Sequence, residues 1–209
     1  MPQAQAHSDA NDHDHDPAVP YHYEHSLATG PLADASTRIA HPNDTSAVGL
    51  VQEAVWRAAY STVLPQEVVD QFDASSFARV WRDSLSAPPS PRHVLLVSCA
   101  GEQVVGFVAV GPSIDRDASE TSGEVLALGV HPDARHSGHG SRLLNAAVDT
   151  LRDRGFSSMC VWLLARDEDT RAFLTAAGLS PDGAYRDRVI DDDGTLAREV
   201  RLTADLSLD

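Results

Sequence analysis

Residues 130–144 read VHPDARHSGHGSRLL, and the rest of the chain is best understood from this stretch outward. An apolar run, Val125–Val130, leads into it, and apolar residues with helical spacing follow it, so the pattern predicts a strand, a glycine loop and a helix. Gly138 and Gly140 let the backbone approach a ligand closely, and the first N–H groups of a helix lack internal partners. The loop is therefore a candidate site for a phosphate or pyrophosphate, with Arg135 adding a positive charge.

Two common nucleotide-binding loops do not fit these residues. A P-loop needs Gly-Lys-Ser/Thr, which is missing, and the glycines do not have the spacing of a dinucleotide fold. The run Arg135–Gly140, Arg-His-Ser-Gly-His-Gly, instead resembles the acetyl-CoA signature Arg/Gln-x-x-Gly-x-Gly/Ala of the GNAT N-acetyltransferase superfamily. The flanking segments 130–132 (Val-His-Pro) and 141–144 (Ser-Arg-Leu-Leu) are similar to that family as well.

The resemblance implies an acyltransferase with acetyl-CoA as its co-substrate. Its pyrophosphate would be held by consecutive loop residues, namely Arg135, His136, Ser137, Gly138, His139, Gly140 and Ser141. Pantetheine and the thioester oxygen would lie along Leu128, Gly129 and Val130. Gly129 is expected at a bulge that splays the central strand from its neighbour. Asp167 would accept a hydrogen bond from a pantetheine amide.

Glu124 is the candidate base for the substrate ammonium. It precedes Arg135 by eleven residues, the spacing at which the histone-acetyltransferase branch of the superfamily places its catalytic glutamate. Strand alternation would put Glu124 on the same face as Leu126, Leu128 and Val130, and apolar surroundings would raise its pKa. A strand-end glutamate in solvent is an equal alternative, because Gly123 directly precedes it.

The acid for the leaving thiolate is where the chain departs from the family. Many members carry a tyrosine on the helix after the fifth strand, but here Leu174 occupies that position, and Asp167 replaces an asparagine. Leucine cannot donate a proton. Tyr185, on the next strand, is the candidate substitute, with a core or rim tyrosine as the alternative. Leu174 also leaves open a non-catalytic acyl-CoA-binding sensor.

Residues 56–65, WRAAYSTVLP, resemble the end of the first helix in many bacterial members, where this region lines the acceptor pocket. Trp56 and Tyr60 are therefore candidate substrate contacts, and core packing is the alternative for each. The spacing of apolar residues predicts a second helix from Ser75 to about Leu85, with Phe77, Val80 and Trp81 facing inward.

The order of predicted elements matches an α/β (α+β) GNAT fold, a mixed sheet of about seven strands flanked by about four helices and splayed where acetyl-CoA would lie. The acetyltransferase domain is expected to span residues 37–209. Its predicted strands are 37–40, 93–100, 103–111, 123–130, 158–164, 179–189 and 196–204.

Residues 1–36 form a separate tail rich in His and Asp, which we expect to be disordered because it holds few branched apolar residues. Metal capture by this tail is an alternative, but its spacing is not that of a structural site, so no metal is predicted.

The formal net charge of −15 disfavours nucleic acid as a partner and favours a cationic amine. The expected acceptor is thus a small-molecule or peptide amine. The sequence holds no apolar run long enough to span a membrane and no signal-peptide pattern, which indicates a cytoplasmic protein. Cys99 and Cys160 lie in apolar runs and are expected to be buried thiols. Members of the family are often homodimers.

Overall fold

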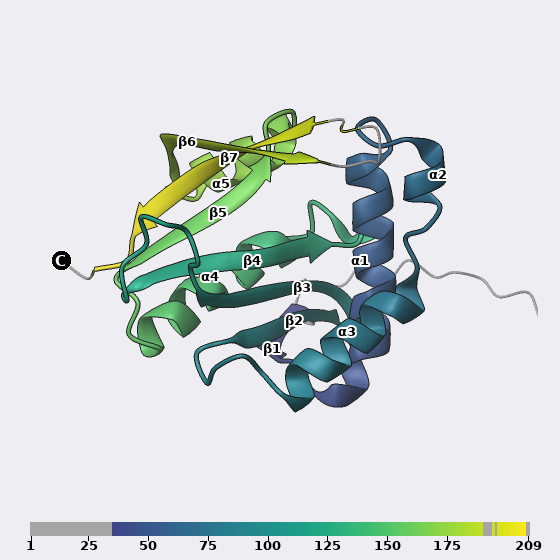
Figure 1. Cartoon of the computed structure of the whole chain (residues 1–209). Coiled ribbons are helices and arrows are strands. Elements are labelled where there is room, and N and C mark those ends of the chain that lie inside the picture. Colours follow the sequence, from purple (N-terminus) through teal and green to yellow (C-terminus); the bar gives the residue numbers. More distant parts are fainter. Residues whose placement is uncertain (1–34, 190–193, 195, 208–209) are drawn as a thin grey trace, which may run out of the picture. The chain divides into compact units, whose positions relative to one another are not determined.

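The computed structural model describes residues 35–189, 194 and 196–207. Seven strands form one sheet in the order β1-β2-β3-β4-β5-β7-β6 (Figure 1). The strands are β1 (Ala35–Ile39), β2 (Val94–Ala100), β3 (Gln103–Pro112), β4 (Ser122–Val130), β5 (Ser158–Leu164), β6 (Ser180–Val189) and β7 (Leu196–Asp205). β4 and β5 pair in parallel, as predicted from the helix that crosses between them, and the other neighbouring pairs are antiparallel.

The α-helices of the described residues are α1 (Thr45–Tyr60), α2 (Gln66–Val69), α3 (Ala74–Ser86), α4 (His139–Asp153) and α5 (Glu168–Ala176). The predicted tail, 1–36, lies outside the described residues except for its last two, which belong to β1. The fold class and the order of the long elements are confirmed. The short helix α2 was not predicted, because a single turn carries no apolar periodicity.

The sheet separates two cores, which follow from the alternation of side chains along its strands. On one face, which we call the α1 face, residues of α1 such as Val48 and Val51 pack with Val97 and Phe107. On the other, the α4 face, residues of α4 and α5 pack with β2, β3, β5 and β7. That core includes Leu143, Leu144, Ala147, Leu151, Leu174, Val108, Met159 and Leu202.

Close helix packing positions the end of α1. A Cβ on Gly49 would lie 2.3 Å from the carbonyl oxygen of Ala74, so α1 and α3 cross at a distance that only glycine permits. The predicted inward face of α3 was partly wrong. Val80 is 61% exposed, whereas Trp81 packs beside Phe107 and donates a hydrogen bond from its indole nitrogen to Gln52.

β4 separates from β5 midway along its length. The two strands pair only from Ser122 to Val125, and the β3–β4 register shifts at the next residue, so that Leu126 is an extra residue in β4. The splay was predicted, but its bulge lies at Leu126 and not at Gly129, which pairs regularly with Phe107. An extra residue reverses the alternation of side chains, which sequence periodicity alone does not reveal.

The bulge also overturns the predicted alignment of side chains along β4. Val125, Leu128 and Val130 pack on the α4 face, whereas Ala127 packs on the α1 face. Glu124 precedes the bulge and lies on the α1 face, opposite to Leu128 and Val130. The prediction that these residues share one face with Glu124 was wrong.

Candidate active site

The glycine loop ends in a left-handed residue that begins α4. Gly138 has φ of +81° at the helix N-cap, and His136 has φ of +60°. In the part of the chain that the structure describes, the backbone N–H groups of residues 136–141 have no acceptor. Six unpaired donors at a helix N-terminus form a site suited to an anion such as a pyrophosphate.

The side chains around the loop fit this interpretation unevenly. Arg135 is exposed, and its guanidinium lies near the carbonyl oxygen of Val130. Arg142 donates to the carbonyl of Ser137, and its guanidinium lies 2.7 Å from the position that a Cβ on Gly138 would take. A side chain at residue 138 would therefore displace the Arg142 guanidinium and strain a left-handed backbone. Gly140 faces Phe173 of α5 instead, at ordinary contact distance.

His139 was predicted among the residues that hold the pyrophosphate, but its side chain is not available to a ligand. It is 5% exposed, and its Nδ1 lies 2.8 Å from the Ser98 hydroxyl of β2, so it packs beneath α4 and does not contact a ligand at the loop. Burial lowers the pKa of His139, with a further contribution from Arg142, so the ring is neutral. Its backbone N–H remains part of the anion cradle.

The splayed part of β4 supplies the second half of a cofactor site. Beyond Val125 the edge of β4 that faces β5 has no strand partner among the residues that the structure describes, and its backbone groups are available for an extended ligand such as pantetheine. Leu128, Gly129 and Val130 all lie on this segment. Asp167 caps α5 at the same end of β5, where its carboxylate accepts from the Thr170 N–H.

Glu124 lies in β4 opposite Cys160 of β5, one residue before the last β4–β5 pair, Val125 and Val161. It is 7% exposed, and its carboxylate accepts a hydrogen bond of 3.2 Å from the Ser113 hydroxyl. Burial is the main cause of a raised pKa for Glu124, and the negative charge of Asp115 adds to it. Of the two alternatives for this residue, the structure excludes the glutamate in solvent.

Asp115, Glu124 and Cys160 form a cluster whose ligand-type atoms lie within 4.8 Å of one another. Protein groups already occupy Asp115, which accepts from Trp162 Nε1 at 3.0 Å and from Arg201 at 2.9 Å. Burial raises the pKa of Cys160 to about 11, so the residue is a thiol at neutral pH. This chemistry suits neither a metal site nor a cysteine nucleophile.

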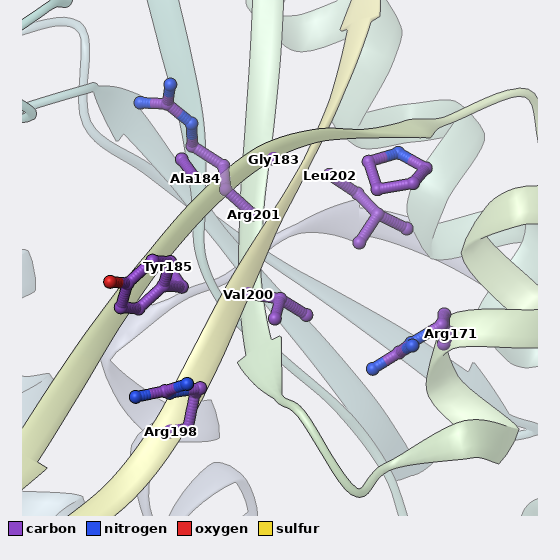
Figure 2. A pocket seen from close by; sticks show the side chains of 9 residues that line it. Arg171, Gly183, Ala184, Tyr185, Arg198, Val200, Arg201 and Leu202 are labelled. Atoms are coloured by element: carbon purple, nitrogen blue, oxygen red, sulfur yellow. The ribbon is translucent and has the colours of Figure 1, made fainter.

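The two tyrosines of the described chain lie in different places. Tyr185 is 62% exposed on β6, opposite Val200, and belongs to the α4 face, while Glu124 is on the α1 face. Figure 2 shows it beside Arg198, at the rim of a depression of about 290 Å³ across from Arg171. Two strands, β5 and β7, separate it from β4, so the structure does not bring Tyr185 to the splay.

Tyr60 lies at the end of α1, where burial is the main cause of a raised pKa for its hydroxyl. The charges of Glu199 and Asp167 add to this effect, and those of Arg188 and Arg186 oppose it. Trp56, one turn earlier, stacks on Phe107 with ring centroids 6.3 Å apart and belongs partly to the core. Leu174, at the position of the family tyrosine, is fully buried among core residues of the α4 face.

Sequence reasoning missed the polar side chains that surround Glu124 on the α1 face. Trp162 of β5 lies below the Arg186 guanidinium, which is 4.2 Å from the ring centroid and paired with Glu199. Arg201 of β7 binds Asp115, and also Asp117 and Asp182. The only sequence signal was the unusual density of arginines in the two last strands.

Comparisons with known proteins agree with this geometry. The pattern of the acetyltransferase (GNAT) family matches residues 54–178, more than half of the chain. YuaI of Bacillus subtilis, an uncharacterised N-acetyltransferase, is 25% identical over 152 residues, which cover 73% of this chain and 83% of that protein.

Solved structures show the same fold. YncA from Salmonella typhimurium, with acetyl-CoA bound, has a TM-score of 0.62 at 17% identity, over 83% of this chain and 95% of that one. The PaiA N-acetyltransferase of Thermoplasma acidophilum, with coenzyme A bound, has a TM-score of 0.64 at 14% identity, over 82% of this chain and 98% of that one. The chain therefore belongs to the GNAT family of acetyltransferases and is an acyltransferase with acetyl-CoA as its co-substrate.

Proposed function

We propose that this protein transfers the acetyl group of acetyl-CoA to a primary amine of a small molecule or peptide, by direct attack within a ternary complex. The observation that carries the proposal is the position of Glu124, a buried carboxylate at the residue pair next to the splay. An amine must lose a proton to attack a thioester, and a carboxylate with a raised pKa accepts one efficiently near neutral pH.

Each half of the proposed cofactor site has its own role. The backbone donors of residues 136–141 and the charge of Arg135 hold the pyrophosphate, and the free edge of β4 along Leu128–Val130 holds pantetheine. Asp167 stays a proposed pantetheine contact, although one of its oxygens already caps α5. Direct transfer is supported by the chemistry of Cys160, because a thiol with a pKa of about 11 is a poor nucleophile.

We assign the acceptor side of the site to Tyr60 and the exposed edge of Trp56. Tyr60, and not Tyr185, is the described tyrosine close to Asp167 and the C-terminal end of β5. Its raised pKa keeps the hydroxyl protonated, so it can donate a hydrogen bond to the acceptor or to the leaving thiolate. The variant Tyr60→Phe should therefore lower kcat by about 100-fold or more, which is the low end for a positioned proton donor.

The test of the function is the variant Glu124→Gln, measured for thiol release with a panel of amines and for acetyl-CoA binding by calorimetry. The amide keeps the size of the side chain and can still bond Ser113, but it cannot take a proton. We expect kcat to fall about 100-fold or more with an unchanged Kd for acetyl-CoA. A native protein that binds acetyl-CoA but acetylates no amine would contradict the proposal and favour the non-catalytic sensor.

A further inference from the structure

A pair of arginines shares a single carboxylate on the α1 face of the last hairpin. Glu199 of β7 is nearly buried, and both Arg186 and Arg188 of β6 direct their Nε atoms to it. Within this group of three side chains, one negative charge stands against two guanidinium groups. Electrostatics at this end of the face thus favours an anion from outside the protein.

Arg186 is the better placed of the two to meet a ligand. Its guanidinium lies over Trp162, 4.2 Å from the ring centroid, and about a third of its side chain is exposed. Glu199 accepts a hydrogen bond only from Nε of Arg186, and within the described residues the two terminal nitrogens of Arg186 have no protein partner. A planar guanidinium with two parallel donors free is well suited to bind a carboxylate through two hydrogen bonds.

The other end of the same face is acidic. Glu124 pairs with Cys160 in the β4–β5 register, and Trp162 follows Cys160 by two residues on β5, a strand rise of roughly 7 Å. Asp115 lies beside Glu124, with its carboxylate bonded to Trp162. The α1 face thus presents carboxylates near the splay and a guanidinium one step away, with an indole between them.

Helices leave this part of the sheet accessible. Among the strands, α1 packs mainly against β3 and β4 (Figure 1). The α1 face of β5 and β7 carries Trp162, Glu199 and Arg201. A small ligand that spans the strand rise of roughly 7 Å between Cys160 and Trp162 would place its ammonium at Glu124 and an anionic group at Arg186. Two hydrogen bonds of about 3 Å and a short spacer are enough to cover the distance.

We propose that the acceptor is a zwitterion of the amino acid class, whose ammonium lies at Glu124 and whose carboxylate binds Arg186. This inference rests on the proposed function, since it names the substrate class of the same site. It replaces the cationic acceptor that the net charge of the chain suggested, because the charges that face the site are mixed. Arg186 is then a residue that determines specificity.

The test compares the standard L-amino acids in three matched forms: the free acid, the carboxamide and the decarboxylated amine. Thiol release from acetyl-CoA gives kcat and KM, and calorimetry on the enzyme–CoA complex gives Kd for each form. We expect kcat/KM of the preferred free acid to exceed that of its carboxamide and amine about 10- to 100-fold, the usual worth of hydrogen bonds to a charged group.

Arg186→Gln should remove this preference by raising KM for the free acid about 10- to 100-fold, and should change kcat/KM for the decarboxylated amine much less, through the lost charge near Glu124 alone. Arg186→Lys should restore part of it. Glu199 keeps Arg188 in both variants, which preserves the fold, and a thermal melt verifies this. The matched control is Arg198→Gln on the same hairpin, whose side chain pairs with Asp187 on the opposite face and should leave all three forms unchanged.

The outcomes separate the two proposals. Acetylation of carboxamides or amines as fast as free acids would overturn the zwitterion and leave the acetyltransferase intact. Free acids that bind the CoA complex through Arg186 without any turnover would support the ligand class but overturn the proposed reaction. If the free acids do not bind the CoA complex and are not preferred over their carboxamides, the zwitterion proposal is overturned.

Discussion

Burial gives Glu124 opposite effects on catalysis and on stability. Its pKa lies above the ordinary value, so it is protonated and inactive at low pH, and kcat/KM should rise as pH increases through that pKa. The folded state prefers the protonated form. Its contribution to stability is therefore present below the unfolded pKa and is lost as pH rises through the folded one.

Glu124→Gln should consequently be at least as stable as the native protein at pH 8, and should lose this advantage at pH 4. Thermal unfolding midpoints at both pH values measure the difference. The pH dependence of kcat/KM below neutrality should disappear in the variant. If the variant were less stable than the native protein at pH 8, the favourable contacts of the Glu124 carboxylate would have to outweigh the cost of burying its charge.

Gly138 tests the anion cradle at a single residue. Gly138→Asp introduces a side chain where φ is +81° and a negative charge where the six unpaired N–H groups converge. We expect the Kd for CoA to rise at least about 100-fold, because the pyrophosphate would meet a like charge and the new carboxylate would compete for the Arg142 guanidinium beside the loop. Calorimetric titration measures it.

The control for this substitution is Gly178→Asp, at the end of α5. That glycine also has a positive φ, of +98°, and has nothing near its missing Cβ, so the backbone strain is similar and the loop is untouched. Unchanged CoA affinity in Gly178→Asp, with a large loss in Gly138→Asp, would assign the effect to the cradle. Similar losses in both variants would assign it to strain.

Elements with long apolar patterns are the part of the fold that the sequence predicted well. The β2–β3 hairpin consists of two continuous apolar runs, which are buried almost throughout, and the apolar residues of α4 have helical spacing and are buried. The bulge at Leu126 was missed because it is an extra residue in an otherwise apolar strand. When apolar residues occupy both faces of a strand, the sequence does not show which face each residue takes. His139 was misplaced for a related reason: a polar residue in a glycine loop gives no sign that Ser98, distant in sequence, will satisfy it.

The crossing of α1 and α3 depends on Gly49, and this can be tested with two identical substitutions. Alanine normally stabilises a helix interior by up to about 1 kcal/mol relative to glycine. At Gly140 the added Cβ would make ordinary contact, so Gly140→Ala should be neutral or slightly stabilising. At Gly49 it would lie 2.3 Å from a backbone oxygen, so Gly49→Ala should cost roughly 1–3 kcal/mol.

Urea unfolding of the two variants measures this difference. Since α1 also carries Tyr60, Gly49→Ala should raise the KM of the amine acceptor while the Kd for acetyl-CoA is kept. Equal stability of the two variants would show that α1 and α3 can move apart without loss, and that the helix crossing does not set the position of the acceptor side.

At the scale of the whole domain, Arg201 joins segments that are far apart in the sequence. Its guanidinium, 13% exposed, binds Asp115 and Asp117 of the β3–β4 loop and Asp182 of β6. Such a convergence is invisible in the sequence, because each partner alone looks like a solvated surface charge. In Arg201→Met the three carboxylates would face one another without a cation.

We expect Arg201→Met to lose about 2 kcal/mol through the contact with Asp115, the central range for hydrogen bonds between charged groups. This corresponds to a fall in Tm of roughly 4–8 °C for a chain of this size. Arg198→Met, which removes the pair of Arg198 and Asp187, is the control and should change Tm little, since that pair is largely exposed.

The pH dependence of this loss identifies its electrostatic origin. Arg201 lowers the pKa of Asp117 to about 2, below its ordinary value of 3.8. A carboxylate with a depressed folded pKa stabilises the fold above its unfolded pKa, and this contribution disappears as pH falls through the folded value. The gap in Tm between the native protein and Arg201→Met should therefore be constant from pH 7 to about 5 and narrow towards pH 2. A gap that stays constant down to pH 2 would mean that Arg201 acts by packing over Trp162, and that the charges of the loop contribute nothing to holding it on the sheet.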